Sequence, residues 1–166
     1  MSIVLDIVRT YRTPREVMAR RIGADVREDR ALAVLMGACV LIFVAQWPRL
    51  ARTAHFDTDV GFDALLAGAL FAWLFVAPLL LYVLSLLVQI AFKLVGRTAN
   101  GYSVRMAMFW GLLAAAPLFL LTGLTGGFVG PGPALNLVGG LAFVTLIVFW
   151  ITGLALVAQR RPETES

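Results

Sequence analysis

The stretch from Met106 to Gln159 decides the fold: MAMFWGLLAAAPLFLLTGLTGGFVGPGPALNLVGGLAFVTLIVFWITGLALVAQ. It contains no Asp, Glu, Lys or Arg, and as one helix it would be more than twice as long as a bilayer core is thick. The chain must therefore fold back inside it. Five glycines and two prolines between Gly123 and Asn136 predict the turn, and Pro133 suits the first position of a closing helix. We predict two membrane spans here, 105–124 and 133–159.

Two further uncharged stretches predict two more spans. The first, 31–48, lies between Arg30 and Arg49, and the second, 64–92, lies between Asp63 and Lys93. The second stretch is too long for an upright helix and too short for two crossings, so we predict one tilted helix. Because proline removes a backbone hydrogen bond, we expect helix kinks at Pro78 and Pro117.

The composition favours the same class of protein. Hydrophobic residues make up 60% and charged residues 14% of the 166, and the mean hydropathy is +0.87. A soluble domain carries about 25% charged residues, so a water-soluble globule of this composition is excluded. We predict an all-α integral membrane protein, a four-helix transmembrane bundle with short interfacial amphipathic helices at its N-terminus.

The basic residues predict the orientation. With the N-terminus in the cytoplasm, 12 of the 14 basic residues fall on the cytoplasmic side, and only Arg49 and Arg52 fall on the other. This asymmetry favours four spans with both termini in the cytoplasm. Splitting 64–92 at Pro78 would give five spans, but each half would be too short to cross.

The segment 1–25 precedes the transmembrane domain, 26–159, and a charged cytoplasmic tail, 160–166, follows it. A helical projection of the first residues separates an apolar face from a polar one; the apolar face holds Ile3, Val4, Ile7, Val8 and Tyr11, and the polar face Asp6, Arg9 and Arg12. A second short helix is expected from Pro14 to about Ile22, capped by Thr13 and Glu16 and ended by Gly23. The first membrane helix is expected to begin near Val26.

Basic side chains of this front segment suit the membrane surface. Anionic headgroups attract arginines in such a position, and a partner-docking surface is the alternative interpretation. We favour the lipid interpretation, because basic amphipathic segments are explained by lipid alone. The residues concerned are Arg9, Arg12, Arg15, Arg20 and Arg21.

Candidate chemistry is sparse. No Asp, Glu, Lys, Arg or His lies at depth within a predicted span, so we expect no catalytic residue, no proton relay and no cofactor. His55, with Asp57, Asp59 and Asp63 nearby, lacks a second imidazole or thiolate, and we predict no metal site. Cys39 is expected to be a packing residue. No basic run is interleaved with aromatic residues, so no nucleic-acid partner is expected.

Small residues recur at fourfold spacing in the spans, which allows helices to approach closely. Packing glycines are predicted at Gly37, Gly68 and Gly111. These seams either hold the four helices together, which we favour, or join two copies as a homo-oligomer.

The order of features resembles the bacterial branch of the Ypt-interacting-protein (Yip) family of small multi-pass membrane proteins. The resemblance runs from about Pro14 to Ala158, through TPREVMARRI, GRTANGYSVR, AMFWGLLAAAPLFLL and WITGLALVAQ. Its single matching positions are Pro14, Gly96, Gly101, Arg105, Pro117 and Gly153. The family's usual fifth span follows a Gly-Leu pair such as Gly153-Leu154; we do not expect it here, because the charged RRPETES follows.

This resemblance implies a non-enzymatic membrane protein. It implies vesicle trafficking through small GTPases only for eukaryotic relatives, and 13 arginines among 14 basic residues favour a bacterial source instead. We therefore expect a protein of the bacterial inner membrane that acts by interaction with lipids, a protein partner or a second copy. A small transporter, channel or accessory subunit is the alternative, since prolines free backbone carbonyls at depth.

Overall fold

The computed structural model describes residues 3–23, 26–56, 60–97 and 99–159, and every regular element in these ranges is helical. Two short helices, α1 (Ile3–Arg12) and α2 (Pro14–Ile22), come first. The long helices that follow are α3 (Glu28–Phe56), a continuous helix made of α4 (Phe62–Phe71), the π-helical turn η1 (Ala72–Val76) and α5 (Ala77–Leu94), then α6 (Gly101–Phe128) and α7 (Pro133–Gln159). The predicted all-α class is confirmed.

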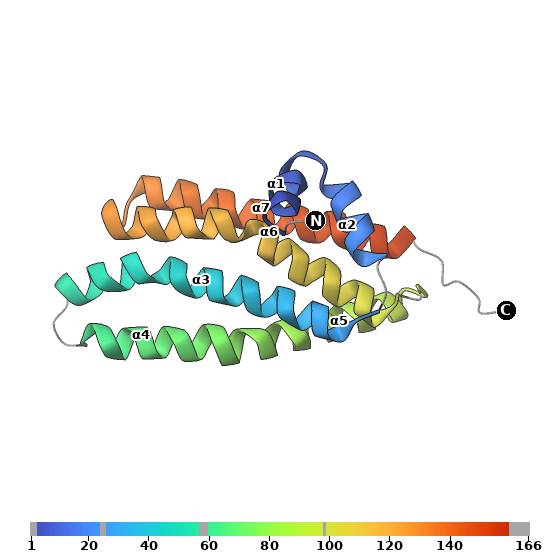
Figure 1. The fold of residues 1–166 in the computed structure, drawn as a ribbon, viewed down its shortest axis with the longest axis horizontal. Coiled ribbons are helices and arrows are strands. Elements are labelled where there is room, and N and C mark those ends of the chain that lie inside the picture. Colours follow the sequence, from blue (N-terminus) through green and yellow to red (C-terminus); the bar gives the residue numbers. More distant parts are fainter. Residues whose placement is uncertain (1–2, 24–25, 57–59, 98, 160–166) are drawn as a thin grey trace.

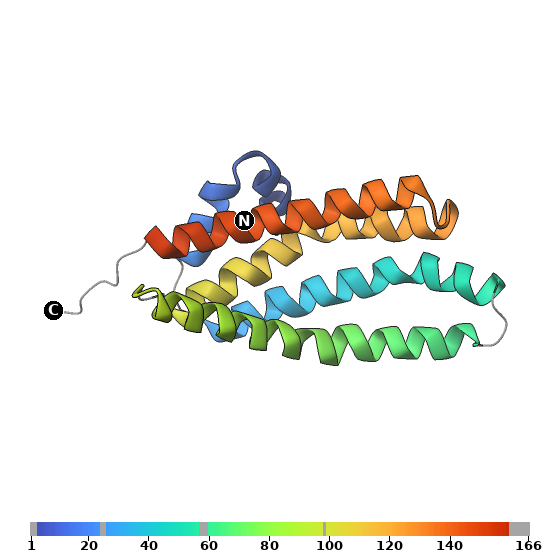
Figure 2. The same ribbon diagram turned by 180° about the vertical axis from the view of Figure 1, so that it is seen from behind.

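Four helices are long and apolar enough to cross a membrane: α3, the α4–η1–α5 helix, α6 and α7. They have 29, 33, 28 and 27 residues, so each is longer than the roughly 30 Å core of a bilayer. Figures 1 and 2 show them side by side along the long axis, with the start of α3 and the end of α7 at one end. We call this the terminal end and the other the opposite end. The protein is a multi-pass helical membrane protein.

The first membrane helix is longer than predicted. It begins at Glu28, two residues after Val26, and continues through Pro48 to Phe56, so His55 lies in its last turn and not in a loop. Pro48 lacks a backbone N–H and would normally weaken the helix at this point. Here Gly127 of α6 packs directly against Pro48, which supports the helix from outside.

The turn predicted from Gly123 to Asn136 is wrong in extent. α6 runs to Phe128 and α7 begins at Pro133, as predicted for Pro133, so only residues 129–132 connect the two helices. The glycines of α6 serve close contact instead. A Cβ added at Gly123 would overlap the carbonyl oxygen of Ala45 in α3 and lie 2.7 Å from its carbonyl carbon. Glycine is needed there because the two backbones touch.

The centre of the bundle is α6. From Tyr102 to Ala116 every residue except the half-buried Arg105 is buried, mainly against α3 and α7. The largest fully buried side chains include Trp110, Tyr102 and Phe109. α6 changes direction about halfway along its length in Figure 1, and Pro117 lies inside it, consistent with the predicted kink.

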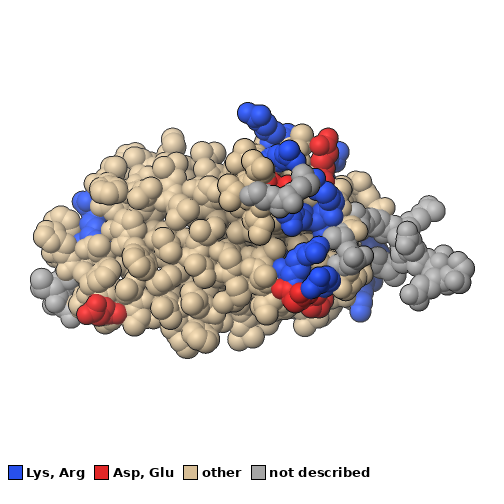
Figure 3. All heavy atoms as spheres, viewed as in Figure 1, with Lys and Arg blue, Asp and Glu red and all other residues tan. Residues whose placement is uncertain are grey.

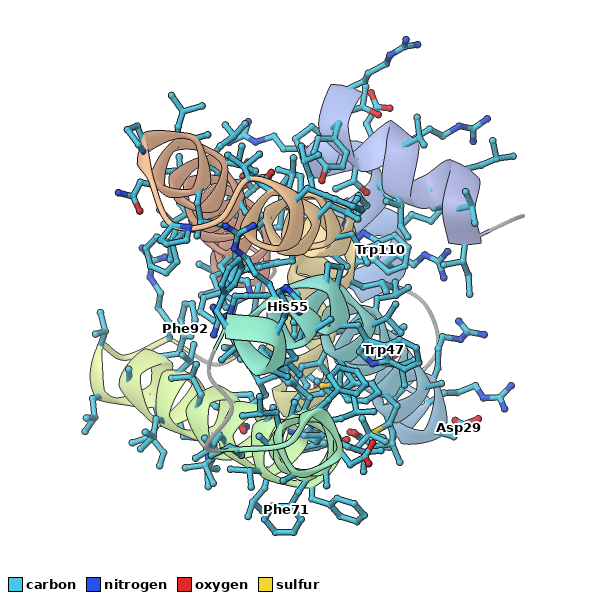
Figure 4. All side chains as sticks on the ribbon, turned by 90° about the vertical axis from the view of Figure 1, so that its left-hand side faces the viewer. Asp29, Trp47, His55, Phe71, Phe92 and Trp110 are labelled. Carbon is cyan, nitrogen blue, oxygen red and sulfur yellow. The ribbon has the colours of Figure 1, made fainter. Side chains whose placement is uncertain are left out.

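The α4–η1–α5 helix lies at the edge of the bundle. In an apolar stretch of 18 residues of this helix only 11% of the residues are buried, against 61% in the corresponding stretch of α6. Most of the surface of the α4–η1–α5 helix would therefore face lipid. Phe71, for example, points away from the bundle in Figure 4. Near Pro78, where a kink is predicted, the helix contains the π-helical turn η1, which ends two residues before the proline, and it remains continuous.

The three predicted packing glycines have different surroundings. A Cβ at Gly111 would lie 2.9 Å from Cδ1 of Trp150, so Gly111 lies at a close contact between α6 and α7. At Gly37 the nearest atom would be Cδ1 of Leu113 at 4.0 Å, an ordinary contact. At Gly68 no atom lies within 4 Å, and the predicted packing role is not seen.

Candidate functional site

The charged side chains gather at the terminal end, as Figure 3 shows, while the middle of the bundle is uncharged. Of the described basic residues, only Arg49 and Arg52 belong to the opposite end. A band of charge at each end of an uncharged middle is the distribution expected of a membrane-spanning bundle. The candidate site is therefore the terminal end, and above all the two short helices, which we call the platform (α1 and α2).

α1 lies across the bundle and not along it, since Figure 1 shows it nearly end-on where the long helices run horizontally. Its side chains form three faces and not the predicted two. Asp6 and Thr10 face the bundle and are buried, with Ile7 half-buried beside them. Val4 and Val8 are exposed, and so are Arg9 and Arg12 on another side. α1 therefore has one face against the bundle and two exposed faces, one apolar and one basic.

Asp6 is buried, although the sequence pattern predicted that it lies on the polar face with Arg9 and Arg12. It is only 2% exposed, and its carboxylate is held by two arginines of α2. Arg20 donates from Nη2 to Oδ1 at 3.1 Å, and Arg21 donates to Oδ2. A buried carboxylate is tolerated only when it is paired and hydrogen-bonded, and both arginines meet that need. These bonds join α1 to α2.

Thr10 and Trp110 join α1 to the centre of the bundle. The Thr10 hydroxyl donates to the carbonyl oxygen of Asp6 at 2.7 Å and accepts from Nε1 of Trp110 at 3.2 Å. The guanidinium of Arg21 lies over the Trp110 ring, 4.3 Å from its centroid. Figure 4 shows Trp110 beside the N-terminal helices. Trp110 therefore binds the platform through both its ring nitrogen and its face.

A third connection uses Tyr11, which the sequence pattern placed on the lipid side. Its hydroxyl donates to the carbonyl oxygen of Ala114 in α6 at 2.8 Å, and its ring meets Phe149 of α7 edge-on at 5.4 Å. Burial raises the pKa of the Tyr11 hydroxyl, which keeps it protonated as a donor. Ala114 lies three residues before Pro117, where a proline disturbs the backbone hydrogen bonds of a helix. Tyr11 therefore uses a carbonyl in the region of the kink.

α2 covers the start of the bundle. It runs from Pro14 to Ile22 and is followed by Gly23, as predicted, and it buries Val17, Met18 and Ile22 against α6 and α7. The predicted cap is wrong, because Thr13 makes no side-chain cap bond to α2. Its hydroxyl donates backwards instead, to the carbonyl oxygen of Arg9 at 3.4 Å.

The five predicted membrane-surface arginines divide into two groups. Arg20 and Arg21 hold Asp6 and so have a structural task. Arg9, Arg12 and Arg15 are exposed and take part in no ion pair within the described residues. Between α1 and α2 lies a hollow of about 360 Å³, and its lining includes Arg9, Arg12, Thr13, Glu16, Val17 and Arg20. The net charge of the side chains that line this hollow is positive.

A further ion pair at the terminal end joins α3 to α6. Arg105 of α6 binds Glu28 of α3 through two bonds, one of them from Nε to Oε2 at 3.1 Å. Neither this pair nor the roles of Asp6, Thr10 and Trp110 were predicted from the sequence. The available signal was a carboxylate and a hydroxyl four residues apart in an otherwise apolar helix, followed by a pair of arginines.

Among the described residues no group of three His, Cys, Asp or Glu side chains could hold a metal ion. Asp57 and Asp59 lie outside the described residues, and His55 is exposed at the opposite end (Figure 4). Cys39 is free and buried in α3.

Comparison of the chain with protein-family models, with curated proteins and with solved structures finds no match.

Proposed function

We propose that this protein acts without catalysis, as a Yip-like membrane-organising protein that interacts with lipids or with a protein partner through its platform. The observation that carries the proposal is the anchoring of α1 across the bundle. Its polar face is bonded to α2 and α6, while Val4, Val8, Arg9 and Arg12 stay exposed. A helix held in this way presents apolar and basic side chains together at the membrane surface.

Anionic headgroups are the ligand that fits this surface best. Three exposed arginines, Arg9, Arg12 and Arg15, have no internal partner among the described residues, and two of them line the basic hollow. A basic residue near an anionic membrane contributes about 1 kcal/mol of attraction. The three arginines together would therefore enrich anionic lipid around the protein. A protein partner with an acidic surface would use the same side chains.

The test measures lipid enrichment. The full chain is reconstituted in bilayers of phosphatidylcholine and phosphatidylglycerol, extracted in a mild detergent, and its co-purifying lipid is quantified. The variant Arg9→Gln/Arg12→Gln/Arg15→Gln is expected to lose much of its phosphatidylglycerol enrichment. The matched control is Lys93→Gln/Arg97→Gln, which removes two exposed charges from the same end but outside the platform.

Equal loss of enrichment in both variants would show a general effect of charge and contradict a role for the platform. Unchanged enrichment in the platform variant would contradict the lipid interpretation. The partner interpretation then predicts that a cross-linker placed at Arg12 captures a second protein in native membranes, and that this protein is lost in the platform variant.

The source membrane proposed here is the bacterial inner membrane, with both termini in the cytoplasm. Support comes from the concentration of basic residues at the terminal end, which the positive-inside tendency places in the cytoplasm. Membership of the Yip family is likewise proposed, on the sequence features named above.

A small transporter, channel or accessory subunit is the second candidate, favoured by the π-helical turn before Pro78 in the middle of a span. Such turns are frequent at functional sites. Solute flux in vesicles containing the purified protein, compared with empty vesicles, tests this candidate.

A further inference from the structure

The opposite end carries a second arrangement of arginines. Arg49 and Arg52 lie one turn apart in the last part of α3, beside the connection between α6 and α7. Among the described basic residues they are the two at this end, which carries few charges in Figure 3. Their tasks differ.

Arg52 is a structural residue. Its Nη1 donates to the carbonyl oxygens of Gly127 and Phe128, at 3.1 and 3.4 Å, and its guanidinium lies 5.1 Å from the ring centroid of Phe56. These carbonyls belong to the last turn of α6, where a helix carries partial negative charge. Gly130, with a φ of +88°, leaves room for the guanidinium, since a Cβ there would lie 2.6 Å from Nη2.

Arg49 has no such task. Its aliphatic part packs beside Gly126, where a Cβ would lie 3.5 Å from Cδ and Cγ of Arg49, but the residue as a whole is exposed. Its guanidinium makes no ion pair or hydrogen bond with a described residue. Within the described part of the chain, its N–H donors and its charge therefore stay available to a ligand.

Arg49 borders a hollow of about 520 Å³ between α3 and the α6–α7 connection. Besides the two arginines the lining includes Thr53, and the other walls are apolar or glycine, including Phe56, Pro131 and Leu135. The Thr53 hydroxyl already donates to the carbonyl oxygen of Arg49 at 3.0 Å. The hollow thus combines a positive rim with apolar walls.

We propose that this hollow binds one anionic phospholipid, with the phosphate on Arg49 and an acyl chain along Phe56 and Leu135. The charge complementarity selects an anion, and guanidinium groups suit phosphate oxygens. The apolar walls select an amphiphile, and the ends of spanning helices lie at the depth of the headgroups. This site is separate from the platform, at the other end of the bundle.

The experiment removes the platform's contribution first. The variant Arg9→Gln/Arg12→Gln/Arg15→Gln serves as the background, and native mass spectrometry of the intact chain counts bound phosphatidylglycerol against phosphatidylcholine. The background protein is expected to retain one phosphatidylglycerol in preference to phosphatidylcholine. Adding Arg49→Gln should weaken this binding about tenfold, the effect of losing a charged hydrogen bond. Arg97→Gln, an exposed arginine at the terminal end, is the matched control and should change nothing.

A second variant tests the apolar part and does not depend on Arg49. Leu135→Trp places a larger side chain in the hollow and should reduce phosphatidylglycerol binding while leaving the arginines in place. Circular dichroism and gel filtration verify that each variant is folded. Inorganic phosphate is added in a separate arm.

The proposal is overturned if Arg49→Gln retains phosphatidylglycerol like the background, or if phosphatidylcholine is retained equally. It is also overturned if inorganic phosphate alone displaces the lipid, since the site would then be one for a free anion. Each of these results leaves the platform measurement unaffected, because that measurement compares different variants.

Discussion

Replacing Gly123 with alanine tests the closest contact in the bundle, between α6 and α3. The new methyl carbon would overlap the carbonyl oxygen of Ala45 and lie 2.7 Å from its carbonyl carbon. Ordinary contacts of a Cβ begin at 3.4 Å. The carbonyl carbon alone would require the helices to separate by about 0.7 Å, and the oxygen requires more. Both groups of Ala45 are backbone, so no side-chain rotation can relieve the overlap.

The expected effect has two opposing parts. Alanine is favoured over glycine inside a helix by about 0.5–1 kcal/mol. Forcing extra volume into a closely packed contact costs about 1–3 kcal/mol, and more when the backbone must move. α3 and α6 form the most extensive helix pair of the bundle, so separating them weakens contacts along their length. The overlap is with backbone, so the packing cost lies at the upper end of this range. After subtraction of the helix gain, we expect Gly123→Ala to lower the free energy of unfolding by about 2 kcal/mol.

The assay is reversible unfolding of the purified chain in mixed micelles of a mild detergent and dodecyl sulfate, followed by circular dichroism. Gly140→Ala is the matched control, because Gly140 also lies inside a helix and an added Cβ would meet no atom within 4 Å. The control should be unchanged or slightly stabilised. Gly123→Ala behaving like Gly140→Ala would refute the close approach of the two backbones and the reasoning built on it.

Three other predictions concern the ion pairs and the chain termini at the terminal end. Asp6→Asn should leave Arg20 and Arg21 without their carboxylate and loosen α1, seen as faster hydrogen exchange in residues 3–12 while exchange in α6 stays slow; unchanged protection would show that the ion pairs do not hold α1. Glu28→Gln and Arg105→Gln should each cost at most about 1 kcal/mol, since Glu28 is half exposed, and a double-mutant cycle should return a coupling of that order; independent effects of the two changes would contradict the pair. Reporter tags at the two termini should face the same compartment, because an even number of helices crosses the membrane; tags on opposite sides would exclude the four-span arrangement.

The contacts that hold α1 to α2 and to the bundle could not be predicted from a helical projection of α1. The projection separated apolar from polar residues of α1, and this placed Asp6 with the solvated arginines. Asp6 is buried because Arg20 and Arg21 of the following helix reach it. The helical projection of α1 includes only residues of α1, so it cannot show that arginines of α2 bind Asp6.

Arg52 illustrates the same limit at the opposite end. The sequence interpretation ended the first span at Pro48 and counted Arg52 as an orientation signal. In the structure Arg52 also binds carbonyl groups of Gly127 and Phe128, more than seventy residues away in the chain. Only the folded bundle brings the end of α6 beside α3.

The amino-acid sequence by itself determined the number of membrane-crossing helices and their approximate limits, because hydrocarbon strongly disfavours charged side chains and unpaired backbone groups. It also determined the start and end of α2, through Pro14 and Gly23. The tertiary structure decided which helix faces meet. Gly123, Gly126 and Gly127 lie within α6 and contact α3. The α4–η1–α5 helix lies at the edge of the bundle. The physical reason is that apolar helices in lipid have no contrast between a buried and an exposed face, so their pairing depends on the fit of shapes.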